Sequence, residues 1–131
     1  YVYPDTMVAC GEQEFTNEKE TQLKNPTLIV EVLSQSTKDY DRTNKFAYYR
    51  TLPSFKEYIL IHSDQITVET FYKGEANYWK IATYFSLDEI VKINAFDIES
   101  FTHRKRRLVF VAPVPGFQVL PCRRISSNAV A

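Results

Sequence analysis

The stretch that decides the fold is Thr27-Leu28-Ile29-Val30-Glu31-Val32-Leu33. It is an apolar run, rich in β-branched residues and interrupted by one carboxylate. A short run of this kind is typical of a strand that is buried on both faces, as strands are in the parallel part of an α/β sheet. Burying Glu31 in such a strand is costly unless its charge is neutralised, hydrogen-bonded or bound to a cation. The carboxylate therefore needs an explanation beyond packing.

A helix and a second buried strand follow this run along the chain. Candidate N-caps are Ser34, Ser36 and Thr37, and aromatic and apolar side chains then recur with near-helical spacing as far as Leu52, where Pro53 ends the helix. Residues 57–62 (EYILIH) are predicted to form another buried strand. The order strand, helix, strand is typical of a parallel crossover unit, so the sequence predicts an α/β fold.

The remaining predicted elements are short strands and the loops that join them. Alternation of apolar and polar residues predicts strands at 2–10, 66–72 and 77–85, with a short edge at 90–93. Lys73-Gly74-Glu75-Ala76 is predicted to be a four-residue hairpin loop in which the glycine takes a positive φ. The polar segment 11–25 is expected to be a solvated loop.

The composition is that of a single folded domain. The chain has 131 residues, of which 44% are hydrophobic and 15% aromatic, enough for a core. Its 16 basic and 16 acidic side chains cancel, so any binding to nucleic acid or membrane must use local patches. No apolar run approaches the roughly 20 residues of a membrane span. Cys10 and Cys122 have no metal-ligand spacing and do not suggest a disulfide framework, so we expect a cytoplasmic protein.

The two ends of the chain differ from its middle. The chain begins at Tyr1, inside an alternating apolar run with no turn or cap before it, which suggests that upstream strands and a helix belong to the same domain. Residues 1–99 are therefore expected to be the C-terminal part of that domain. Residues 100–131 form an atypical tail without a regular period, and its basic cluster, Arg104 to Arg107, is either a solvated segment or a phosphate-binding patch.

Two carboxylates are candidates for a metal site. If Asp5, in the first predicted strand, met Glu31 on a neighbouring strand, the two charges would repel unless a divalent cation lay between them. The main-chain carbonyl of Val32 offers a third oxygen ligand. Hard oxygen ligands favour Mg²⁺ or Mn²⁺ over Zn²⁺. The alternatives are a turn or edge-strand role for Asp5, and a buried ion pair of Glu31 with Lys45 or Arg42.

Lys45 is the candidate cationic partner of these carboxylates. It follows Asp41 by one turn on the predicted helix, from where it can lean back over the strand end and orient water or stabilise charge on a phosphate. Taken alone, a lysine at such a position is more often a solvated helix residue. His62, at a strand end, is interpreted as a hydrogen-bonding histidine, and the many aromatic side chains are interpreted as packing residues.

Several motifs together resemble a known family. They are Tyr3-Pro4-Asp5, residues 25–34 (NPTLIVEVLS), Tyr40-Asp41-Arg42, residues 45–49 (KFAYY) and Glu57-Tyr58. On these residues the chain resembles the Uma-two family of restriction endonucleases, which belongs to the PD-(D/E)XK nuclease superfamily. The resemblance extends from Tyr1 to Asp97 and is most specific between Asn25 and Tyr58.

The resemblance implies a restriction-endonuclease-like core, with a mixed β-sheet and a crossover helix, and a Mg²⁺- or Mn²⁺-dependent endonuclease that acts on DNA. Asp5 would take the place of the superfamily's metal-binding aspartate and Glu31 that of its second acid, while Val32 would supply its carbonyl. Lys45 would act as the catalytic lysine. No membrane partner is expected, and a homodimer is one option for the assembly.

The chain also departs from the family pattern. Leu33 stands at the usual lysine position, so the resemblance requires the lysine to have moved to the following helix. Gln35 stands where proline is common, and the tail from Ser100 does not resemble the family's usual ending. The alternative functions are a non-catalytic DNA-binding or assembly module, in which Asp5 and Glu31 are kept for folding, and an unrelated metal hydrolase.

Overall fold

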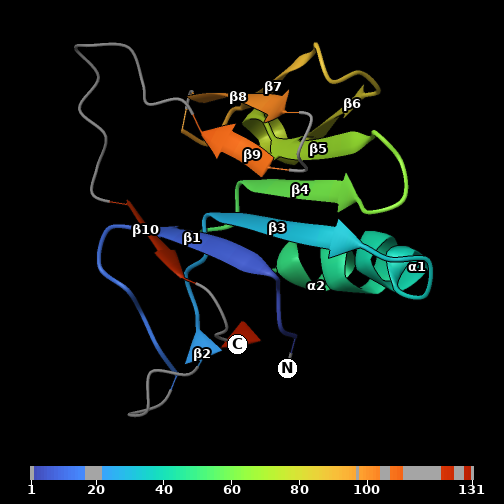
Figure 1. Cartoon of the computed structure of the whole chain (residues 1–131). Coiled ribbons are helices and arrows are strands. Elements are labelled where there is room, and N and C mark those ends of the chain that lie inside the picture. The colour runs from blue at the N-terminus through green and yellow to red at the C-terminus, as the bar shows by residue number, and fades with distance from the viewer. Residues whose placement is uncertain are drawn as a thin grey trace.

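The described residues form three β-sheets and a helical segment at 38–49 (Figure 1). The structure is a computed structural model of the 131-residue chain. It describes residues 2–16, 22–96, 98–103, 107–110, 122–125 and 129–130, the last four ranges as backbone only.

The largest sheet has six strands in the order β10-β1-β3-β4-β5-β6. Their bounds are β1 Thr6–Cys10, β3 Leu28–Leu33, β4 Glu57–His62, β5 Val68–Lys73, β6 Trp79–Tyr84 and β10 Cys122–Ile125. β3 and β4 are parallel, and the other neighbouring pairs are antiparallel. The predicted α/β fold, a mixed sheet with a crossover helix, is confirmed.

The crossover between β3 and β4 consists of α1 Lys38–Tyr40, the π-helical η1 Asp41–Lys45 and α2 Phe46–Tyr49. It lies on one face of the large sheet, where Phe46 stacks on Tyr58 with 5.5 Å between ring centroids (Figure 1). Thr37 occupies the N-cap position but makes no capping hydrogen bond with its side chain. No helix in the described part of the chain has the length and hydropathy of a membrane span.

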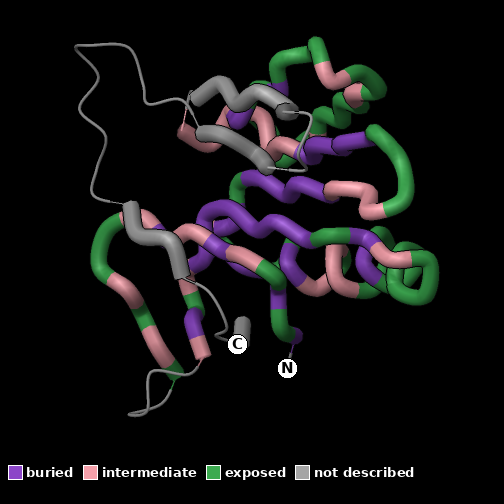
Figure 2. The backbone as a smooth tube through the Cα atoms, viewed as in Figure 1, coloured by how far each residue is buried: buried purple, intermediate pink, exposed green. Residues whose placement is uncertain are grey.

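A three-stranded sheet lies on the face of the large sheet opposite to the helical segment. It consists of β7 Ile90–Ile93, β8 Ile98–His103 and β9 Arg107–Phe110, all antiparallel. Val91 and Ile93 pack with Leu28 and Val30, whereas Leu33 packs on the helix side. β3 is therefore buried on both faces, as its apolar run predicts, and Figure 2 shows this burial continuing into β4.

The hairpin loop before β6 differs from the prediction. The positive φ angles belong to Ala76 (55°) and Asn77 (62°), whereas Gly74 has a φ of −82°. The chain turns in a short 3-10 segment, η2 Glu75–Asn77, and the Gly74 amide closes the loop by donating to the Tyr78 carbonyl at 2.8 Å. The predicted short edge at 90–93 is a strand, but it belongs to the three-stranded sheet.

Pairings between distant segments were not predicted. β2 Gln22–Leu23 lies inside the expected loop and pairs in parallel with β11 Ala129–Val130. The tail also supplies β9 and β10, although its sequence shows no strand period. Of the basic cluster, residues 104–106 lie outside the described residues, and Arg107 begins β9.

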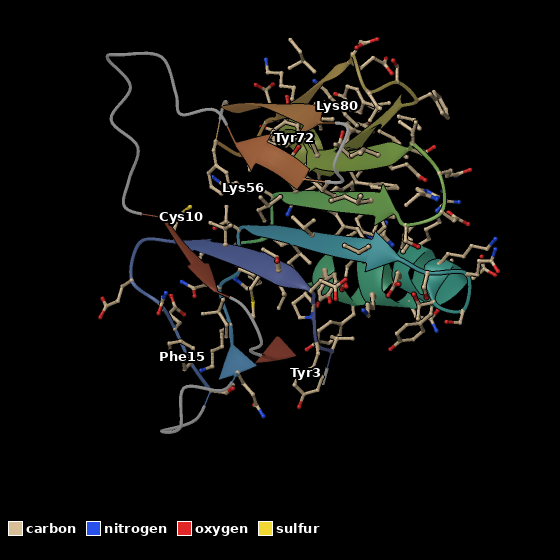
Figure 3. All side chains as sticks on the ribbon, viewed as in Figure 1. Tyr3, Cys10, Phe15, Lys56, Tyr72 and Lys80 are labelled. Atoms are coloured by element: carbon tan, nitrogen blue, oxygen red, sulfur yellow. The ribbon has the colours of Figure 1, made fainter. Side chains whose placement is uncertain are left out.

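Cys10 is disulfide-bonded, which contradicts the expectation from its sequence spacing. The antiparallel register of β1 and β10 places Cys10 opposite Cys122. Spacing could not reveal this because the two strands come from opposite ends of the chain. Figure 3 shows Cys10 at the far end of β1 from Tyr3, so the disulfide lies away from the candidate site near Asp5.

Candidate functional site

The two predicted acidic residues meet where β1 begins and β3 ends. Because Thr6 pairs with Val30 in antiparallel register, Asp5 lies beside Glu31. The Asp5 amide donates to Glu31 Oε2 at 3.3 Å, and Asp5 Oδ2 accepts a hydrogen bond from the Val32 amide at 2.7 Å. The structure therefore brings together Asp5, Glu31 and Val32, although Val32 contacts Asp5 through its N–H and not through its carbonyl.

Lys45 reaches the same carboxylate from the helix. Its Nζ donates to Glu31 Oε1 at 3.0 Å. The same Nζ forms an ion pair with Asp41 Oδ1 at 2.8 Å. Both residues belong to the π-helical segment η1, and π turns occur frequently at functional sites. Lys45 is thus a shared counter-ion for two carboxylates, and not a solvated helix residue.

Two tyrosines complete the inner part of the site, and neither was assigned a role from the sequence. The Tyr49 hydroxyl donates to Glu31 Oε1 at 3.0 Å. The Tyr58 hydroxyl donates to the Asp41 carbonyl at 3.0 Å. A signal for Tyr49 exists in the sequence, because Asp41, Lys45 and Tyr49 are spaced four residues apart and therefore share one helix face.

The ionisation of the site is set mainly by burial. Glu31 is only 2% exposed, and desolvation raises its pKa above the ordinary value although Lys45 and Tyr49 stabilise its charged form. Asp5 adds to this increase by charge repulsion. Burial alone would lower the pKa of Lys45, but its contacts with Asp41 and Glu31 together raise it. The ammonium is therefore held in its charged state.

The site is open to solvent on one side. Asp5 is exposed and Val32 is 48% exposed, in contrast to the buried pair Glu31 and Asp41. Among the described residues, no cluster of three or more histidine, cysteine or acidic side chains could hold a metal ion. A metal here would accordingly bind the two carboxylates Asp5 and Glu31 together with main-chain oxygen or water.

A family described as "Putative restriction endonuclease", Uma2, matches residues 1–102. The chain belongs to the Uma2 family. This confirms the resemblance read from the motifs, and the candidate site lies wholly within the matched region.

Two curated relatives of this Uma2 chain come from the cyanobacterium Synechocystis. The uncharacterized protein sll1609 is 42% identical over 79 residues, covering 60% of this chain and 45% of the relative. The uncharacterized protein slr1290 is 35% identical over 91 residues, covering 69% of this chain and 46% of the relative. The chain thus spans about half the length of the curated relatives it matches. No solved structure matches.

Most of the other residues of this Uma2 chain that were considered from the sequence are buried, hydrogen-bonded or packed against the core. Leu33, at the position where the superfamily usually has lysine, is buried in the helix-side core at 2% exposure. His62 is hydrogen-bonded at the strand end, as interpreted from the sequence. Most of the aromatic side chains are buried or packed against the core, and Tyr78 is an exposed exception.

Proposed function

We propose that this Uma2 chain forms the metal-binding part of a Mg²⁺-dependent endonuclease that hydrolyses DNA phosphodiester bonds. The observation that supports the proposal is the convergence of Asp5, Glu31 and Lys45 at one solvent-accessible strand end. A pair of carboxylates with a neighbouring ammonium suits a phosphate bound through a divalent cation, because the cation and the ammonium can share the phosphate's negative charge. Family membership agrees with this reaction class.

The charges of the site favour a divalent cation. Glu31 and Asp41 pair with Lys45 and Asp5 lies beside Glu31, so three carboxyl groups share one ammonium. A bound Mg²⁺ would balance the two remaining negative charges. Among the described residues, no donor contacts Asp5 Oδ1, which is left to bind a cation or water. Oxygen ligands from carboxylates suit Mg²⁺ or Mn²⁺, and the Val32 carbonyl is the third protein ligand that we propose.

Each protein group has a definable part in this reaction. The bound metal would act as a Lewis acid and would lower the pKa of a water molecule. Asp5 is fixed by the Val32 amide and Glu31 by Tyr49, so both carboxylates are oriented in advance. Lys45, held by Asp41, would place its ammonium beside the scissile phosphate and stabilise the charge that develops there.

Cleavage of DNA by matched variants tests the proposal. The protein with Mg²⁺ should cut duplex DNA, and Glu31→Gln should lower the rate by at least about 100-fold, the upper end of losses seen when outer ligand contacts are removed. Glu75→Gln, at an exposed glutamate in the hairpin loop, should cut at the unchanged rate. Full activity of Glu31→Gln would overturn the assignment of Glu31.

A second candidate function is a non-catalytic DNA-binding or assembly module. One observation favours it: the oxygens of Glu31 already accept hydrogen bonds from Lys45, Tyr49 and the Asp5 amide. In this alternative the cluster only compensates a buried charge. Titration with Mn²⁺ separates the two functions, because a ligand that binds only the folded state raises the melting temperature. An increase that is absent in Glu31→Gln supports the nuclease, and no increase supports the module.

A further inference from the structure

A second charged cluster lies on the helix side of the sheet, next to the candidate metal site. Arg42, which follows Asp41 in η1, forms an ion pair with Glu69 of β5. His62 Nε2 lies 2.8 Å from Glu69 Oε1, and Gln65 Nε2 lies 3.0 Å from His62 Nδ1. The proposed reaction uses none of these four residues.

The sheet register relates the two clusters to each other. Glu31 pairs with Leu60 on β4, and Leu60 pairs with Glu69 on β5, so the two glutamates occupy one row on the same face. Two strand spacings separate them by about 10 Å between backbones. Asp41 and Arg42 are consecutive in η1: Asp41 is linked to Glu31 through Lys45, and Arg42 contacts Glu69 at the other end of this row. A substrate that crosses the strand ends can therefore meet both clusters.

Hydrogen bonding fixes the orientation of the guanidinium group. With the Gln65 amide as donor, His62 Nδ1 is the acceptor, so the His62 proton is on Nε2 and is donated to Glu69. Glu69 in turn accepts from Arg42 Nη2. No described residue accepts from Nε or Nη1 of Arg42. The guanidinium group is thus held through one nitrogen and keeps further donors for a ligand.

The exposure of the three side chains is uneven. The Arg42 side chain is 41% exposed, whereas the side chains of Glu69 and His62 are only 11% and 8% exposed. If the ion pair were only structural, burying Glu69 and His62 behind a cation that stays in solvent would add little to the stability of the fold. The arrangement instead presents a fixed cation at the surface, beside the predicted site of phosphate cleavage.

We infer that Arg42 binds a phosphate of the DNA backbone next to the scissile phosphate, with Glu69 and His62 as positioning residues. The inference rests on the proposed nuclease function. The planar fork of an arginine suits bidentate hydrogen bonding to phosphate oxygens, which a lysine ammonium does not reproduce. Phosphate contacts position a nucleic acid without reading its sequence. Arg42 would therefore set the register of the backbone relative to the metal site.

The salt dependence of DNA binding tests this inference. A labelled DNA duplex is titrated with the protein in Ca²⁺ at several salt concentrations, and a gel checks that the duplex stays intact. Arg42→Met should weaken binding about tenfold, as expected for a hydrogen bond to a charged group. It should also reduce the slope of log affinity against log salt by about 0.9, the value for one phosphate contact. Arg42→Lys should keep the slope but bind more weakly than the wild type.

Arg50→Met is the matched control. Arg50 is exposed at the C-cap of the same helical segment, eight residues further on, about 12 Å along the axis and away from the strand ends. The control should bind DNA with the wild-type slope. Equal losses in Arg50→Met and Arg42→Met would attribute the effect to net charge and would overturn the inference.

The remaining outcomes separate this inference from the proposed function. If the wild type binds and cuts DNA and Arg42→Met matches it in affinity and slope, only the phosphate contact is overturned. If the wild type binds no DNA at any of these salt concentrations, both the nuclease function and the phosphate contact are overturned. Melting temperatures show whether each variant folds. If Arg42→Met does not fold, Arg42→Lys takes its place, and an affinity of Arg42→Lys for DNA equal to that of the wild type would overturn the bidentate contact.

Discussion

At the scale of single residues, Lys45 is the group on which two buried carboxylates depend. Lys45→Met removes the ammonium that lies beside Glu31 and Asp41, each of which is only 2% exposed. Removing one partner of a buried ion pair typically lowers the free energy of unfolding by about 3–5 kcal/mol. Urea unfolding at neutral pH without divalent metal measures this loss.

Two further variants check the interpretation of that loss. Lys38→Met, at an exposed position in α1, should leave the unfolding free energy unchanged within about 0.5 kcal/mol. The double variant Lys45→Met with Glu31→Gln should recover part of the loss, because one of the unpaired charges is then absent. A Lys45→Met protein as stable as the wild type would show that the carboxylates do not need this counter-ion.

Tyr49 stabilises the same carboxylate through a neutral hydrogen bond. Tyr49→Phe removes the donor at 3.0 Å from Glu31 Oε1 while keeping the ring in the core. We expect a loss of about 1–2 kcal/mol in the free energy of unfolding, the usual cost of leaving a buried acceptor with one partner fewer. Tyr48→Phe is the control, because its ring packs against the same core and its hydroxyl has no described partner. Equal effects in both variants would argue against a specific role for Tyr49.

The residues of the site could be predicted only in part. Glu31 was visible because a carboxylate inside an apolar strand conflicts with burial, and Lys45 was visible because the family motifs include it. Their contact confirms the predicted proximity, although their roles in catalysis stay predictions. Tyr49 was missed because an aromatic residue on a helix is usually explained by packing alone, and its hydroxyl partner is 18 residues away in sequence.

At the scale of elements, Glu57 fastens the end of β7 to the main sheet. This buried side chain accepts hydrogen bonds from the Ala95 amide at 2.7 Å and from Asn94 Nδ2 at 3.3 Å. Burial raises the pKa of Glu57 although these hydrogen bonds oppose the increase. The folded state then binds the proton more tightly than the unfolded chain does. Its contribution to stability is present below the ordinary pKa of 4.5 and is lost as the pH rises through the raised value.

Glu57→Gln should therefore flatten the dependence of stability on pH. The glutamine cannot ionise, and its amide oxygen can still accept from Ala95. Melting temperatures measured upward from pH 4.5 should fall less steeply for the variant than for the wild type. Glu75→Gln, at the exposed hairpin, should follow the wild-type curve. A variant curve parallel to that of the wild type would contradict the assignment of this slope to Glu57.

The elements were predictable where the pattern is local. β4 matches the prediction at 57–62, and the helix lies within its predicted limits, because period and stop signals act over neighbouring residues. Gly74 was misjudged because the bend lies two residues later, at Ala76 and Asn77. The partners of β2 and β1 at the end of the chain could not be foreseen, since nothing in the local pattern identifies a strand more than 100 residues away.

At the scale of the whole molecule, the large sheet combines strands that lie inside the family match with a strand that lies beyond it. The family match covers residues 1–102 and includes β1 to β7, whereas β10 lies beyond it. β10 nevertheless forms an edge of the sheet beside β1, the strand that follows Asp5. β1 is thus flanked on one side by the family core and on the other by the tail.

The disulfide at Cys10 tests whether the tail stabilises this edge. Cys122, the other of the two cysteines, lies opposite Cys10 in register, and a link between them would close a loop of more than 100 residues. Closing so long a loop restricts the unfolded chain, so reduction should lower the free energy of unfolding by about 2–4 kcal/mol. Urea unfolding with and without dithiothreitol measures the difference, and Cys10→Ser should be insensitive to the reductant. Equal stability of the oxidised and reduced wild type would show that the disulfide does not stabilise this edge, so that only the backbone pairing of β10 with β1 would hold the tail there.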